Sequence, residues 1–164
     1  MSIAFNIREV YEMAIQIEKN GVAFYQKAAT LFSDPAMRET LLDLAAQEEG
    51  HEEIFKGMRL ALRTTAHQQW EHFDPEELLY LRAFACGSVF DVTGDISSEL
   101  DESMSPGEIL MMAATKERDS ILFFLGLRDL APVAADRDKI DFIIKEEKAH
   151  MTLLLDRIEQ HGGV

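Results

Sequence analysis

The sequence predicts an all-α protein built from four long helices. Apolar residues recur at intervals of three and four through four long stretches of the chain, which is the spacing of one helix face. No stretch alternates polar and apolar residues with the period of a strand, and capping residues and prolines stand at the boundaries. The length of 164 residues suits one domain with a single core, over residues 1–164.

The first two helices are predicted as an antiparallel pair. The apolar stripe predicts a helix over about residues 7–32, with Asn6 as its cap. Residues 33–35 form a turn, and Pro35 suits the first position of a second helix over about 35–63. Because the link is so short, the two helices should lie side by side.

A long crossover follows the second helix. The helical periodicity is lost over residues 64–73, and Asp74 then has the sequence context of a cap for a short helix over about 75–90. Residues 91–104 are acidic and polar, so we expect an exposed loop there. A connection of this length allows the second and third long helices to run parallel.

The last two long helices are predicted as a second hairpin. Residues 105–108 match a capping box with proline at the first helical position, and they open a helix over about 106–130. Pro132 ends that helix, and the last helix should run over about 133–160. The expected architecture is a four-helix bundle with a short fifth helix in its long crossover.

The composition excludes several classes of function. The chain has 30 acidic and 16 basic residues and a net charge of −14, which disfavours binding to nucleic acid or to anionic membranes. Cys86 is the only cysteine, so an intrachain disulfide or a four-cysteine metal site is impossible in this sequence. The sequence has no targeting signal and no apolar run of membrane-spanning length, so we expect a cytoplasmic protein without a nucleic-acid or membrane partner.

Polar residues interrupt the apolar stripes where a helix of a bundle normally places leucine or isoleucine. They are Glu18, Glu48, His51, Glu117, Glu147 and His150. Residues three apart share a helix face, so each Glu-x-x-His pair offers a carboxylate and an imidazole to one place. All six side chains should therefore point into the bundle.

An internal repeat relates these residues to one another. An offset of 99 residues pairs Glu18 with Glu117, Glu48 with Glu147, and His51 with His150. The same offset places Tyr25 on Phe124. The two hairpins therefore look like copies, and the whole polar set follows the repeat.

Buried carboxylates and imidazoles in this number predict a two-metal site. Four ionised carboxylates in a core would repel one another and lose their hydration, and two divalent cations would balance their charge. A mixed oxygen and imidazole set suits iron or manganese. A plausible arrangement is Glu18 and His51 on one metal, Glu117 and His150 on the other, and Glu48 and Glu147 as bridges.

This pattern resembles that of ferritin-like di-iron carboxylate proteins, which have one Glu on each of two helices and Glu-x-x-His on each of the other two. The chain is most similar to the di-iron domain of rubrerythrins, over about residues 6–160. The resemblance implies a ferritin-like bundle, and it implies two iron ions, or manganese or a mixed pair, held by the six residues. It also implies that Tyr25 hydrogen-bonds a ligand carboxylate.

Two features depart from the rubrerythrin pattern. Rubrerythrins usually carry a further glutamate three residues after the ligand of the third long helix, where this chain has Ser120. They also commonly carry a rubredoxin domain, whose iron site needs more cysteines than Cys86 alone supplies. Electrons should therefore come from a separate donor protein.

The resemblance implies an oxidoreductase that reduces hydrogen peroxide or dioxygen, as in defence against oxidative stress. The glutamates Glu18, Glu48, Glu117 and Glu147 would act through the metals, and the chain would form a homodimer. Two alternatives stay open. One is a ferroxidase or iron-binding protein for storage or detoxification, alone or in a larger shell, and the other is a structural bundle without metal.

Other polar and soft side chains are expected to be structural. Glu49, Glu52, Glu53 and Glu146 should belong to a solvated face, with Glu52 as the first candidate for an exception that contacts the ligands. Met111 and Met112 are expected to fill the core.

Overall fold

The computed structural model describes residues 7–62, 76, 79–81, 98–131 and 133–160, and these contain no strand. The long helices are α1 (Ile7–Leu31), α2 (Pro35–Ala61), α4 (Pro106–Leu130) and α5 (Ala134–Gln160). Each bound lies within two residues of its prediction, so the all-α fold is confirmed. Of the short helix predicted over 75–90, only Glu76 and residues 79–81 are described, and they are helical.

Two of the helices begin where the sequence signals predicted. The carboxylate of Asp34 accepts a hydrogen bond from the backbone N–H of Met37 at 3.1 Å and caps α2. Ser105 accepts from the backbone N–H of Glu108 at 3.3 Å, and the Glu108 carboxylate accepts from the N–H of Ser105 at 2.7 Å. This reciprocal pair is a complete capping box at the start of α4.

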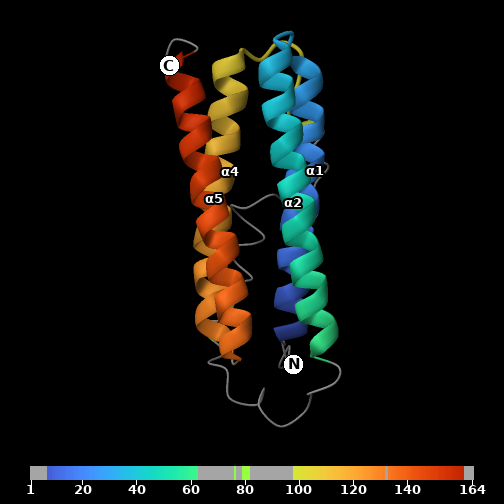
Figure 1. Cartoon of the computed structure of the whole chain (residues 1–164), viewed down its shortest axis with the longest axis vertical. Helices are drawn as coiled ribbons and strands as arrows, with labels where there is room; N and C mark the ends of the chain where they lie inside the picture. Colours follow the sequence, from blue (N-terminus) through green and yellow to red (C-terminus); the bar gives the residue numbers. More distant parts are fainter. Residues whose placement is uncertain (1–6, 63–75, 77–78, 82–97, 132, 161–164) are drawn as a thin grey trace.

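The helices form two hairpins that lie side by side (Figure 1). Helices α1 and α2 make one hairpin, and α4 and α5 make the other. Helices α1 and α5 run in one direction, whereas α2 and α4 run in the opposite one, so α2 and α4 are parallel as predicted. The hairpins meet through α1 against α4 and α2 against α5. Each helix therefore turns one face to the middle of the bundle.

Aromatic side chains fill the core on one side of the polar set. Phe55 on α2 packs on Phe124 on α4 with ring centroids 5.1 Å apart, and both rings are fully buried. They follow His51 and Glu117 along two parallel helices, so they lie on the same side of those residues. This pair excludes water from that end of the polar set.

The crossover reaches the bundle through a buried leucine. Leu81 is 1% exposed, and a Cβ added at Gly126 of α4 would lie 2.6 Å from its Cδ2 atom. Gly126 therefore provides the space in which Leu81 packs on α4. This contact fixes one described part of the long connection to the second hairpin.

The outer faces of the helices are mostly polar. Met111 is 40% exposed, so its predicted core position is wrong, because the inward face of α4 passes through positions 110, 113 and 114 instead. Met112 packs partly buried against the core. Among the described helices, none combines the length and the hydropathy that a membrane span requires.

Candidate metal centre

The six polar residues converge in the middle of the bundle, where the two hairpins face each other. Helix α1 supplies one of them and α2 two, and α4 and α5 mirror this pattern. None of the six is more than 3% exposed. The set is Glu18, Glu48, His51, Glu117, Glu147 and His150. The structure therefore brings together all of the residues that the sequence singled out.

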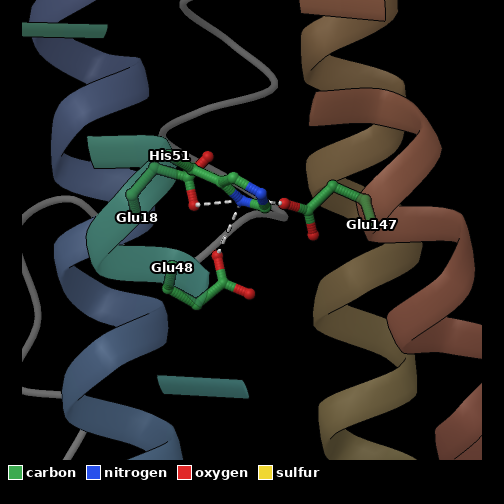
Figure 2. A group of neighbouring side chains, drawn as sticks. All are labelled: Glu18, Glu48, His51 and Glu147. Carbon is green, nitrogen blue, oxygen red and sulfur yellow. Dashed lines mark ion pairs between the residues drawn. The ribbon is translucent and has the colours of Figure 1, made fainter. Parts of the chain in front are cut away.

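The imidazole of His51 faces three carboxylates (Figure 2). Its Nδ1 atom lies 2.8 Å from Oε1 of Glu147, 3.6 Å from Oε2 of Glu48 and 3.8 Å from Oε2 of Glu18. The ligand atoms of these residues all lie within 4.8 Å of one another. We call this group the Glu18–His51 position.

His150 occupies an equivalent place, which we call the Glu117–His150 position. Its Nδ1 atom lies 3.1 Å from Oε1 of Glu48, 3.7 Å from Oε1 of Glu117 and 3.7 Å from Oε2 of Glu147. Glu48 and Glu147 thus present one oxygen to each position. The two imidazole rings stack with their centroids 5.8 Å apart. Two adjacent positions with shared carboxylates are the geometry of a bridged two-metal site.

Several buried atoms in this cluster lack a hydrogen bond. They are Oε1 of Glu18, Oε1 of Glu48, Nδ1 of His51, Oε1 of Glu147 and Nδ1 of His150. Buried polar atoms are normally satisfied, and both unsatisfied imidazole nitrogens are aimed at carboxylates. Divalent cations between these atoms would satisfy them, so the donor set fits two metal ions.

The four carboxyl groups of the cluster fall into two pairs whose pKa values shift in opposite directions. Burial, together with the charges of neighbouring carboxylates, raises the pKa values of Glu18 and Glu117 well above their usual range. Burial would also raise the pKa values of Glu48 and Glu147, but the close approach of a neighbouring carboxyl group and of the two histidines outweighs it and lowers both. Without metal, Glu18 and Glu117 therefore keep their protons to a higher pH than an ordinary glutamate does.

The two histidines hold protons as well. Burial opposes a charged imidazole, but the surrounding carboxylates outweigh it and raise the pKa of His150 to about 12. The pKa of His51 is raised for the same reason, with Glu147 as the main contributor. The metal-free cluster therefore favours protonated imidazoles, whose charge offsets that of the neighbouring carboxylates.

Tyr25 contacts one of the outer glutamates. Its hydroxyl donates a hydrogen bond to Oε1 of Glu117, and the side chain is 1% exposed. Burial and the nearby charge of Glu117 raise the pKa of this phenol, so it stays protonated as a donor. The residue at the repeat offset from Tyr25 is Phe124, which has no hydroxyl.

Two contacts to the histidines were missed from sequence. His51 Nε2 lies 2.8 Å from Oε2 of Glu146, which was assigned to a solvated face, and His150 Nε2 lies 3.2 Å from Oε1 of Gln47. Glu52, favoured for such a contact, instead pairs with Nζ of Lys56 at 2.7 Å. The sequence does contain a signal for these two outer contacts. Gln47 and Glu146 are related by the offset of 99, and each directly precedes a Glu-x-x-His pair.

A glycine lies beside one of the bridging carboxylates. A Cβ added at Gly21 would lie 3.2 Å from Cγ of Glu48 and 3.3 Å from its Cδ, so glycine lets this side chain pack closely against α1. Ser120, at the repeat offset from Gly21, is 2% exposed. The position at which rubrerythrins usually carry a further glutamate is thus a buried serine.

A solved structure resembles the chain over nearly its full length. It is the crystal structure of a Thermotoga maritima protein that is named as a candidate ferritin-like diiron-carboxylate protein. The two chains share 26% sequence identity with a TM-score of 0.71, and the match covers 95% of this chain and 96% of that one. The fold is the ferritin-like bundle. No family model and no curated protein matches the sequence. In a ferritin-like bundle, the buried carboxylate and histidine cluster fits a di-metal centre.

Proposed function

We propose that this ferritin-like chain is a non-haem di-iron carboxylate oxidoreductase of rubrerythrin type. It would reduce hydrogen peroxide or dioxygen with electrons from a separate donor protein. The observation that supports this is the pair of adjacent positions, each with one imidazole and three carboxylates, that share Glu48 and Glu147. A bound iron pair supplies two electrons at one place, as the reduction of an O–O bond requires.

The side chains have distinct tasks in this proposal. Glu18 and His51 would hold one ion, Glu117 and His150 the other, and the two remaining glutamates both. With a cation bound, the proton of His51 would stay on Nε2, where the Glu146 carboxylate can accept it, and Nδ1 would be the ligand. The buried rings of Phe55 and Phe124 close one side and keep bulk water out.

A ferroxidase or iron-binding function is the second candidate. It is favoured by the buried Ser120, which leaves the site without the additional carboxylate that rubrerythrins usually have. A structural bundle without metal is disfavoured, because it would leave the unsatisfied imidazole nitrogens of His51 and His150 buried without a purpose. The homodimer, the donor protein and the cytoplasmic location stay predictions.

An anaerobic Fe(II) titration followed by stopped-flow mixing tests the proposal. We expect two irons per chain, oxidation that is faster with hydrogen peroxide than with dioxygen, and repeated cycles when a chemical reductant is supplied. Faster oxidation by dioxygen, with further Fe(II) consumed and ferric mineral formed, would instead establish a ferroxidase.

Substitutions of the bridging residues test the site itself. Glu48→Ala and Glu147→Ala should each fail to bind two irons, since both positions lose a ligand. Glu49→Ala is the matched control, because Glu49 is exposed on the same helix beside Glu48. An unchanged stoichiometry of two in the Glu48→Ala and Glu147→Ala variants would overturn the assignment.

A further inference from the structure

The inner contacts of the two histidines are nearly symmetric. The shortest distance from each Nδ1 to a bridging carboxylate is 2.8 Å for His51 and 3.1 Å for His150. The distances to the other bridging carboxylate are 3.6 Å and 3.7 Å, and those to the outer glutamates are 3.8 Å and 3.7 Å. From these ligands alone, the two positions would bind a cation almost equally.

The outer contacts of the same two rings are different. Nε2 of His51 lies 2.8 Å from the carboxylate of Glu146, whereas Nε2 of His150 lies 3.2 Å from the amide oxygen of Gln47. An imidazole N–H that donates to a carboxylate makes the opposite nitrogen a more basic ligand, and a neutral amide does so less. His51 is therefore the stronger donor through Nδ1.

The outer glutamates differ in the same direction. Tyr25 donates a hydrogen bond to Oε1 of Glu117, which stabilises negative charge on that oxygen and leaves less of it for a cation. Phe124, the repeat counterpart of Tyr25, has no hydroxyl to offer Glu18. Both differences favour tighter binding of a cation at the Glu18–His51 position than at the Glu117–His150 position.

We propose that the Glu18–His51 position binds a divalent metal more tightly than the Glu117–His150 position, so the two fill in order. Glu146 is the positioning residue that sets this order through His51. Loss of such an outer partner typically lowers metal affinity by about 10- to 100-fold, and we expect a difference of this size between the two positions. The inference rests on the proposed two-metal site.

Titration of the metal-free protein with Mn(II), followed by electron paramagnetic resonance, provides the test. A single bound Mn(II) and a bridged pair give different spectra, so the two binding steps can be resolved. In Glu146→Gln we expect the first step to weaken by about 10- to 100-fold and the second to stay within about twofold. In Gln47→Glu we expect the second step to strengthen and the first to stay unchanged.

Glu49→Gln is the control for lost charge, because it removes the same charge from an exposed site near the cluster. The thermal midpoint of each metal-free variant shows whether the fold is intact. The inference would be overturned if Glu146→Gln weakened both binding steps equally, weakened only the second step, or changed neither. Failure of the unsubstituted protein to bind two Mn(II) ions would instead overturn the two-metal site on which the inference rests.

Discussion

Metal binding to this cluster should release protons in a defined number. The perturbation is the addition of two equivalents of a redox-stable cation such as Co(II) to the metal-free protein at pH 7. The raised pKa values favour a bound proton on each of Glu18, Glu117, His51 and His150 in the metal-free state. All four must leave if carboxylates and neutral imidazoles bind the cations.

The expected magnitude follows from charge balance. Four ionised glutamates and two neutral imidazoles carry four negative charges, which either four protons or two divalent cations would balance. Release of two protons per cation makes the apparent affinity of each step rise by up to about 100-fold per pH unit. The exchange avoids a net buried charge, which would be the main cost of such a site.

The assay is a titration in weakly buffered solution with a pH indicator, supported by calorimetry in buffers of different ionisation enthalpy. Glu18→Gln should release about one proton fewer, because an amide has no proton to lose on metal binding. Glu49→Gln should release as many as the unsubstituted protein. Release of fewer than one proton per cation, or an affinity that is constant between pH 6 and pH 8, would refute the reasoning.

Three further outcomes are expected. Glu18, Glu117 and the two histidines have raised pKa values in the folded protein, so they bind more protons when folded than when unfolded. The free energy of unfolding of the metal-free protein should therefore fall as the pH rises, by about 1.4 kcal/mol per pH unit for each such proton, above about pH 4.5 for the glutamates and above about pH 6.5 for the histidines. Urea unfolding at pH 5.5 and pH 7.5 checks this slope, and a slope that is flat or rises with pH contradicts it. Gly21→Ala should weaken metal binding by about 10-fold, because its Cβ would press on Glu48 at 3.2 Å. Gly57→Ala meets nothing within 4 Å and should keep the affinity while stabilising α2 by about 0.5–1 kcal/mol, as isothermal titration and thermal melts would show. Ser105→Ala should cost about 1 kcal/mol and lower the thermal midpoint by about 2–4 °C, because α4 loses its cap, and an unchanged midpoint would contradict that role.

The long helices and the six-residue set could be predicted because their causes are local or periodic. Asp34 and Ser105 cap helices through contacts with residues only three positions away. The polar set stands out because each member interrupts an apolar stripe and obeys the same offset as its counterpart. Neither signal requires knowledge of how the hairpins pack.

The outer contacts could not be predicted in the same way, because they join the two hairpins. Glu146 and Gln47 lie at positions that a helical pattern assigns to the surface, and each reaches a histidine of the opposite hairpin. Glu52, by contrast, pairs with Lys56, which lies one turn away on its own helix. Which surface residue turns inward depends on the rotation of one hairpin against the other.

Neither hairpin contains a whole site. Each provides two glutamates and one histidine, and the bridging glutamate closest to each imidazole comes from the other hairpin. Most of the close backbone packing lies within the hairpins, so bound metal ions would add direct links between two halves that are joined mainly by side chains such as Phe55 and Phe124. Metal binding should therefore stabilise the contact between the hairpins more than the packing within either one, and a chelator should weaken that contact first.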